Sequence, residues 1–301
     1  MKSKPILKWL GGKSQILDKL LTNFPVEMND YHEPFIGGGS VLLEVLARKH
    51  EGKIKVNGTI YAYDLNEPLI YVYKNIQSFH VELYDNIQTL IKHYNESPTE
   101  GPVNRKPTNL SEAKLSKENY YYWIRSEYNK MTSEDKKLMI GSAMFIFMNK
   151  TCFRGVFRVG PNGFNVPYGH PKNPEIINWE HLVDVHNLIQ GVVFQCCDFT
   201  VPLSSVGLTE RDFVYLDPPY APETETSFVG YTELGFGLEK HNSLFRLCRD
   251  MPAKFVMSNA DVKLVRDNFA GGAYTTESIL CKRAINSKNP ESKTSEVIIK
   301  N

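Results

Sequence analysis

The tetrapeptide Asp217-Pro218-Pro219-Tyr220 combines residue types that could bind and activate an amino group. It follows the apolar run of residues 213–216, which is typical of a buried strand, and ligands often bind where such strands end. Two consecutive prolines stiffen the turn, and we expect their carbonyls to stay free as acceptors. A carboxylate, a carbonyl and an aromatic face suit an amino group on a flat ring, as in adenine or cytosine, or the amide of asparagine or glutamine. A plain turn at the end of a strand can have the same sequence, so other segments must decide.

A glycine turn and a second acid favour a nucleoside-containing cofactor near this tetrapeptide. Gly37 and Gly39 lie between a strand expected over residues 31–35 and a helical pattern, so a ligand could approach the backbone closely there. Asp64 ends the next expected strand, residues 59–63, where an acid commonly accepts hydrogen bonds from ribose hydroxyls. A loop glycine and a surface acid are the simpler alternative.

Three further residues could contact the same cofactor. Asp198 follows a strand expected over residues 192–195 and could accept a hydrogen bond from an adenine amino group. Trp9 and Lys13 flank a glycine pair that does not form a P-loop, because Leu7 stands where that motif needs glycine. These two side chains could still close over a cofactor.

The composition is that of an ordinary soluble protein. The chain has 301 residues, 42% of them hydrophobic and 23% charged, and no apolar stretch is long enough to span a bilayer. Five cysteines without a CxxC pair predict a reduced intracellular protein, expected in the cytoplasm. The eight histidines show no metal-site spacing, so we expect no metal.

Alternating strands and helices predict an α/β protein with a mostly parallel sheet. The expected sheet domain is built from residues 1–80 and 185–301, with a largely helical insertion over residues 81–184. Further strands are expected over residues 213–216, 254–258 and 296–300, helices over residues 69–90 and 120–148, and loops over residues 98–110 and 151–170.

The insertion has the charge and residue types of a nucleic-acid-binding module. Residues 101–172 contain 12 Lys and Arg against 5 Asp and Glu, whereas the whole chain has 35 and 34. Within it, Arg154, Arg158 and Asn165 alternate with aromatic residues and glycines, a mixture typical of contacts to base edges and of side chains wedged into a base stack. A glycine-rich hairpin with solvated charges is the alternative.

Taken in order, these segments resemble the Dam-type (D12 class, alpha group) DNA adenine-N6 methyltransferases, a family that uses S-adenosylmethionine. The resemblance covers nearly the whole chain and implies a Rossmann-like methyltransferase sheet with a DNA-recognition insertion. Its pieces are Lys8-Trp9-x-Gly-Gly-Lys13, Glu33-Pro34-Phe35-x-Gly37-x-Gly39-Ser40, Asp64-x-Asn66, the segment from Asn149 to Pro167, Asp198, Asp217-Pro-Pro-Tyr220, Ser258-Asn259 and the C-terminal strand.

The resemblance implies roles for individual residues. Asp217 and the Pro218 carbonyl would accept the two N–H bonds of the adenine amino group and localise its lone pair, while Tyr220 stacks on the flipped base. The cofactor-binding positions are Trp9, Lys13, Phe35, Gly37, Gly39, Asp64, Asp198 and Asp217. The DNA-binding positions are Arg154, Arg158, Asn165 and Pro167.

The recognition segment departs from the family pattern. Arg154 stands where asparagine is usual, and the spacing from Arg158 to Pro167 is one residue shorter. Recognition of GATC is therefore open, and a related palindrome such as CATG competes with it.

The expected partner is double-stranded DNA, with a cognate restriction endonuclease as a further possibility and a monomer or weak dimer as the assembly. Methylation of RNA or of a protein amide is the nearest alternative, although asparagine is then common at position 217. A non-catalytic DNA-binding relative and, more distantly, a nicotinamide dehydrogenase are the remaining alternatives.

Overall fold

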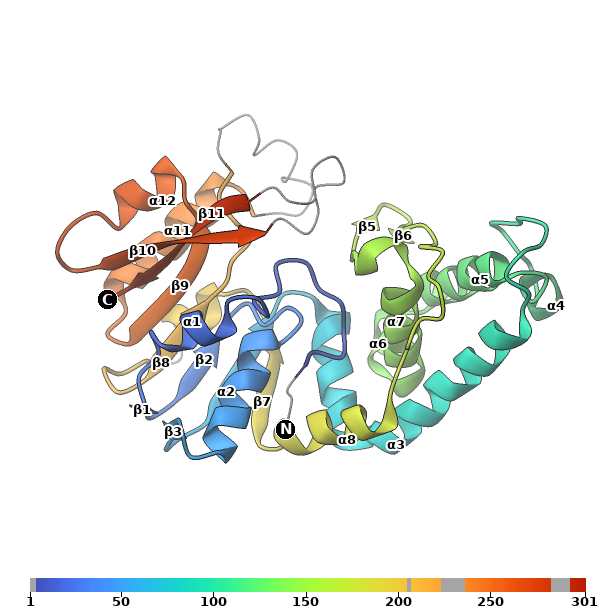
Figure 1. Cartoon of the computed structure of the whole chain (residues 1–301), viewed down its shortest axis with the longest axis horizontal. Helices are drawn as coiled ribbons and strands as arrows, with labels where there is room; N and C mark the ends of the chain where they lie inside the picture. Colours follow the sequence, from blue (N-terminus) through green and yellow to red (C-terminus); the bar gives the residue numbers. More distant parts are fainter. Residues whose placement is uncertain (1–3, 205–206, 223–235, 283–292) are drawn as a thin grey trace. The chain divides into compact units, whose positions relative to one another are not determined.

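The computed structural model describes residues 4–204, 207–222, 236–282 and 293–301. The chain divides into two compact units (Figure 1). The sheet unit contains residues 13–36, 48–65 and 191–301, and the helical unit contains residues 1–12, 37–47 and 66–190.

The sheet unit is built on a seven-stranded sheet with the order β10-β11-β9-β8-β2-β4-β7. The five strands from β9 to β7 run parallel, and β11 pairs antiparallel with both β9 and β10. This confirms the predicted α/β class and the mostly parallel sheet. The strands are β2 (Tyr31–Glu33), β4 (Ile60–Asp64), β7 (Val192–Cys196), β8 (Phe213–Leu216), β9 (Lys254–Ala260), β10 (Thr275–Lys282) and β11 (Lys293–Lys300).

The remaining elements of this unit are short. A second, two-stranded parallel sheet pairs β1 (Glu27–Met28) with β3 (Lys55–Val56). The helices are α1 (Leu17–Leu21), α9 (Thr200–Ser204), α11 (Leu238–Asp250) and α12 (Lys263–Asn268).

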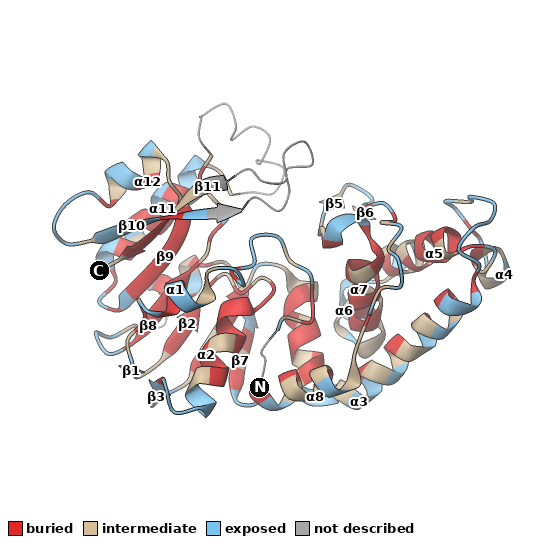
Figure 2. Ribbon diagram, in the orientation of Figure 1, coloured by how far each residue is buried: buried red, intermediate tan, exposed pale blue. Residues whose placement is uncertain are grey.

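Burial explains why the sequences of the central strands are continuous apolar runs. All four residues of β8 are buried, and β9 is buried except at its two ends (Figure 2). Leu244, Phe245 and Cys248 of α11 belong to one apolar cluster with residues of these strands, including Leu216 and Met257. Strands covered on both faces lose the alternation of apolar and polar residues, which is why they could be predicted as continuous apolar runs.

The strands that follow β2 in the sequence lie on both sides of it in the sheet. Strands β4 and β7 lie on one side of β2, whereas β8 and β9, which come later in the sequence, lie on the other. The point between β2 and β8 is therefore the topological switch point, and ligands of open α/β sheets bind outside the carboxyl ends of the strands at such a point.

In the helical unit, a long helix α3 (Glu67–Glu96) packs mainly against α7 (Met139–Thr151). Buried residues lie along α7, which overlaps the end of the helical segment expected over residues 120–148 (Figure 2). Asn66 caps α3, because its side chain accepts the backbone N–H of Leu69 at 3.1 Å. The other helices and strands are α2 (Ser40–His50, which extends beyond this unit), α4 (Leu110–Ala113), α5 (Lys117–Lys130), α6 (Ser133–Lys137), the short 3-10 helix η1 (Phe153–Gly155), β5 (Val159–Gly160), β6 (Gly163–Phe164) and α8 (Trp179–Leu188).

Across the described residues, no helix combines the length and the apolar character needed to cross a membrane.

Candidate active site and recognition segment

Polar side chains gather where the parallel strands of the sheet unit end. Glu33 is the last residue of β2 and Asp64 the last of β4, while Asp217 follows β8 directly. Asp198 lies two residues beyond β7, and Asn259 is the next-to-last residue of β9. Because parallel strands end at the same edge of a sheet, one edge carries all five residues. Glu33 and Asp217 lie on the two strands that flank the switch point.

Asp217 forms a buried ion pair with Lys13. The Nζ atom of Lys13 lies 2.6 Å from Oδ2 of Asp217, and the two side chains are 5% and 19% exposed. Burial raises the pKa of Asp217, and the Lys13 ammonium opposes this shift because it stabilises the carboxylate. The same ammonium lies 5.0 Å from the centre of the Tyr220 ring. Lys13 thus contacts both Asp217, the predicted catalytic carboxylate, and the ring of Tyr220, the predicted stacking surface.

Two further acids, Glu33 and Glu296, interact with this pair, and no sequence motif indicated a role for either carboxylate. Glu33 is buried and accepts a hydrogen bond from the Tyr31 hydroxyl at 2.8 Å. Burial raises the pKa of Glu33 to about 8, while the Tyr31 hydrogen bond lowers it and the charge of Asp217 raises it further. Glu296 accepts a hydrogen bond from the Tyr220 hydroxyl at 2.8 Å, and its charge also raises the pKa of Asp217. In the sequence, Glu33 lies inside the strand expected over residues 31–35 and begins the motif Glu33-Pro34-Phe35, and neither signal indicates a role for its carboxylate.

One expectation about the tetrapeptide is wrong. The Pro219 carbonyl is not a free acceptor, because Nε2 of His241 lies 3.1 Å from it. The two residues are far apart in the sequence, so no local pattern predicts this contact. Pro218, directly beside Asp217, is buried.

Both oxygens of Asp198 contact neighbouring protein groups. Oδ1 accepts hydrogen bonds from the backbone N–H and the hydroxyl of Thr200, at 3.1 and 2.8 Å. Oδ2 pairs with Nζ of Lys240 at 2.7 Å. The pKa of Asp198 is lowered by Lys240 and Thr200, although burial opposes this shift. A cofactor amino group would therefore share this carboxylate with Lys240.

Phe35 belongs to an aromatic cluster. Its ring stacks on Phe199 at 5.5 Å and meets Phe236 edge-on at 5.8 Å between ring centres. These rings pack against the apolar core of the sheet unit. They form an apolar wall beside strands whose ends carry carboxylates, a combination that fits an adenosine group.

The remaining predicted cofactor residues lie in the helical unit. Trp9 is half-buried and packs against both Phe145 and Phe157, with ring centres 6.5 and 6.0 Å away. A side chain at Gly37 would place its Cβ 2.8 Å from the Trp9 ring, so only glycine permits this contact. Gly37 and Gly39 have φ of +48° and +71°, a conformation that favours glycine. The structure therefore joins Trp9 to the glycine turn.

The four predicted DNA-binding residues are exposed and lie on one segment of the helical unit. Nε of Arg158 donates to Oδ1 of Asn165 at 2.6 Å across the hairpin of β5 and β6. The backbone N–H of Phe153 donates to the Pro167 carbonyl at 2.9 Å, which joins the two ends of the segment. Arg154 has a φ of +55°, a left-handed conformation that is costly for arginine. Phe153, beside it, is 49% exposed.

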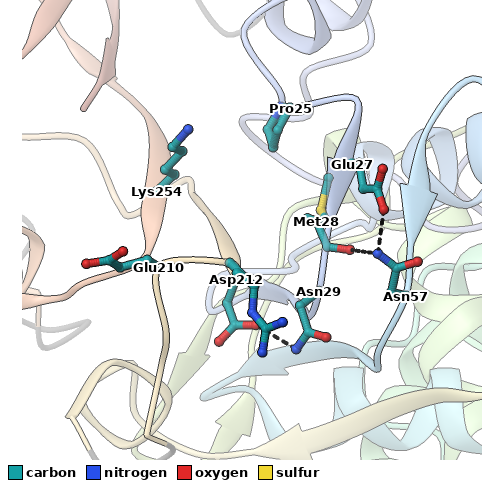
Figure 3. Close-up of a pocket in the computed structure, with 9 residues that line it drawn as sticks. Pro25, Glu27, Met28, Asn29, Asn57, Glu210, Asp212 and Lys254 are labelled. Carbon is teal, nitrogen blue, oxygen red and sulfur yellow. Dashed lines mark hydrogen bonds between the residues drawn. The ribbon is translucent and has the colours of Figure 1, made fainter.

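A pocket at the opposite ends of the strands, where they begin, does not resemble a ligand site. Its volume is about 510 Å³, and it lies near the starts of β8 and β9 (Figure 3). Its polar side chains bind one another: Asn29 donates to Asp212 at 3.0 Å, and Asn57 donates to Glu27 at 2.9 Å. These contacts support the loops that precede the strands.

Comparison with known proteins agrees with this geometry. The family model described as D12 class N6 adenine-specific DNA methyltransferase matches residues 9–286. The type II methyltransferase M.MjaIII of Methanocaldococcus jannaschii is 33% identical over 97% of this chain and 96% of that protein. A DNA adenine methylase of Haemophilus influenzae is 30% identical over 97% of this chain and 90% of its own length. The type II methyltransferase M1.LlaDCHI of Lactococcus lactis is 30% identical over 88% of this chain and 84% of its own.

The matched region includes the tetrapeptide, the acids at the strand ends and the recognition segment. The chain therefore belongs to the D12 class of N6 adenine-specific DNA methyltransferases.

Proposed function

We propose that this enzyme methylates the N6 amino group of an adenine that is flipped out of a short duplex site, with S-adenosylmethionine as the methyl donor. The observation that carries the proposal is the Lys13–Asp217 ion pair beside Pro218 and Tyr220 at the switch point of the sheet.

Asp217 and the Pro218 carbonyl orient the target amino group in this proposal. Lys13 occupies Oδ2 of Asp217, so we assign Oδ1 to one N6 hydrogen and the Pro218 carbonyl to the other. The adenine amine is a poor nucleophile because its lone pair is delocalised into the ring. Two acceptors in fixed positions hold the nitrogen near tetrahedral geometry, and such positioning can supply about 7–11 kcal/mol. As the new N–C bond forms, the bond between sulfur and the methyl carbon would break and leave a neutral thioether, and the nitrogen releases one proton toward Asp217.

Tyr220 supplies the surface on which the flipped base stacks. Its ring is half-buried, and its hydroxyl donates to Glu296 at 2.8 Å, so the outer end of the ring is held in place. The target atom is inaccessible inside a duplex, which is why we propose extrusion of the base.

The donor set fits S-adenosylmethionine. When bound, this cofactor supplies an electrophilic methyl group on sulfur. Asp64 is the carboxylate that we assign to the ribose hydroxyls, since it ends the strand next to β2. The aromatic cluster around Phe35 is assigned to the adenine ring, and Trp9 with Gly37 and Gly39 to the remaining contacts.

Residues 81–184 form the target-recognition domain in this proposal, with a four-base palindrome such as GATC or CATG as the site. Arg158 and Asn165 are joined by a hydrogen bond and present exposed donors, which suits contacts to base edges. Arg154 occupies the neighbouring tip, and Pro167 anchors the base of the segment. Phe153 is exposed beside Arg154 and is suited to wedge into the base stack.

The test is transfer of a labelled methyl group to duplex DNA, single-stranded RNA and protein in parallel. We expect label only in DNA, released as N6-methyladenine after hydrolysis. Sequencing of methylated bases in DNA from cells that express the protein then gives the site. Label in RNA or protein alone would contradict the proposal, and methylation at scattered adenines would contradict a palindromic site.

A further inference from the structure

The peptide groups on both sides of Tyr220 are held by buried side chains from two different elements. His241 of α11 is 1% exposed, and its Nε2 lies 3.1 Å from the Pro219 carbonyl, which precedes Tyr220. Asn259 of β9 is fully buried, and its Oδ1 accepts the backbone N–H of Ala221, which follows Tyr220, at 3.0 Å.

The chemistry of each contact is determined by its surroundings. Oδ1 of Asn259 also accepts the backbone N–H of Ala260 at 2.8 Å. Among the described residues, Nδ2 of Asn259 has no hydrogen-bond partner. The role of this amide is therefore that of an acceptor. Both ring nitrogens of His241 face carbonyl oxygens, Nδ1 that of Gly237 at 3.0 Å and Nε2 that of Pro219 at 3.1 Å. In the inference below, the Nε2 proton is the one that is donated to the Pro219 carbonyl.

We infer that His241 and Asn259 are positioning residues, which hold the backbone around Tyr220 so that the Pro218 carbonyl and the Tyr220 ring keep their catalytic orientation. Neither side chain touches the substrate in this arrangement. Together with the hydrogen bond from the Tyr220 hydroxyl to Glu296, they hold Tyr220 at three points.

Loss of either contact acts on the reaction through geometry. The Pro219 carbonyl belongs to the peptide plane next to the one that carries the Pro218 carbonyl, so a rotation there moves both. A displacement of about 1 Å at reacting groups can cost roughly 10²-fold in rate. In the proposed assignment the Pro218 carbonyl and the Tyr220 ring contact the target base and not the cofactor, so the effect should fall on kcat.

The inference rests on the proposed function, and its test compares two variants at each position. His241→Leu removes the donor, whereas His241→Gln places an N–H near the position of Nε2. Asn259→Leu removes the acceptor, whereas Asn259→Asp keeps it. We expect kcat for duplex methylation to fall roughly 10-fold or more in both Leu variants, which corresponds to about 1.4 kcal/mol. The Gln and Asp variants should recover most of that loss, and cofactor affinity should stay unchanged in all four.

His186→Leu is the matched control. Nδ1 of His186 also contacts a backbone carbonyl, that of Ile76 at 2.9 Å, but in the helical unit and outside the proposed machinery. This variant should keep the wild-type kcat. 2-Aminopurine at the target position gives a second readout, because its fluorescence reports stacking of the flipped base. Both Leu variants at positions 241 and 259 should change that signal, and a loss of stability alone would not.

The outcomes separate the inference from the function that it extends. If the wild-type protein transfers no methyl group to adenine, the proposed function fails. If the wild-type protein is active and both Leu variants retain its kcat, only the positioning role fails. If His241→Leu does not fold, His241→Gln and His241→Asn are compared, because only the longer Gln side chain is expected to reach the Pro219 carbonyl. Equal kcat values for these two variants would overturn the role of His241.

Discussion

Replacement of Lys13 by methionine should affect both stability and the pH dependence of catalysis. Met has a similar length but no charge, so the change leaves Asp217 without the ammonium that lies 2.6 Å away. Lys13 is 5% exposed and Asp217 is 19% exposed, so water screens the pair poorly. Removal of one partner from a buried pair costs about 3–5 kcal/mol when the other charge stays uncompensated.

Asp217 can avoid part of that cost by taking up a proton. Burial and the charge of Glu296 already raise its pKa, and Lys13 is the group that opposes them. Each unit of further shift corresponds to about 1.4 kcal/mol. Since the proposed mechanism needs the ionised carboxylate, the acidic limb of the rate profile should move to higher pH by at least about one unit. The loss of stability should shrink as the pH falls, because a protonated Asp217 needs no counter-charge.

The assay is single-turnover methylation of duplex DNA between pH 6 and 10, together with urea unfolding over the same range. Lys19→Met is the matched control, because Lys19 pairs with Glu277 at 2.7 Å while both side chains are about half exposed. Such surface pairs contribute about 0–1 kcal/mol. The reasoning is refuted if Lys13→Met keeps the wild-type pH profile and loses no more stability than Lys19→Met.

Three further predictions concern other residues. Burial raises the pKa of Glu33 to about 8, whereas the same group in the unfolded chain loses its proton above about pH 4.5. The folded state therefore retains a proton that the unfolded state has lost, and the stability of the wild-type protein should fall as the pH rises toward 8. Glu33→Gln should reduce this slope in urea unfolding, and equal slopes would contradict it. Arg154→Asn should raise the unfolding free energy by up to about 1 kcal/mol, since asparagine tolerates a φ of +55° better, and a loss of stability would count against backbone strain. Arg158→Ala should relax the site preference in methylation mapping with unchanged cofactor affinity, and unchanged selectivity would contradict a readout role.

The strand ends were predictable because two independent local signals coincide there. The runs before Asp64 and Asp217 are apolar over the length of a strand, and each is followed by an acid. Both strands are confirmed as β4 and β8. Strand β10 was not predicted, because it lies at the edge of the sheet, pairs only with β11 and buries only Ile279 among residues 275–280. Because most of these side chains are exposed, the sequence of β10 carries no apolar run.

The partners of the site residues could not be predicted, since they depend on contacts between distant parts of the chain. The sequence offered Asp198 as a cofactor ligand, but its contacts with Thr200 and Lys240 appear only in three dimensions. The pairing of His241 with Pro219 and the elevated pKa of Glu33 have the same origin, because both follow from burial rather than from spacing.

The most direct test of the central claim is a comparison of binding and transfer in Asp217→Ala. Calorimetry would measure affinity for S-adenosylmethionine, and a single-turnover assay would measure methyl transfer to duplex adenine. The account predicts a variant that still binds the cofactor but transfers methyl groups at least roughly 10²–10³-fold more slowly, as expected on loss of a fixed polar partner of the reacting group. Transfer at the wild-type rate would contradict the assignment of Asp217 as the acceptor that orients the adenine amine.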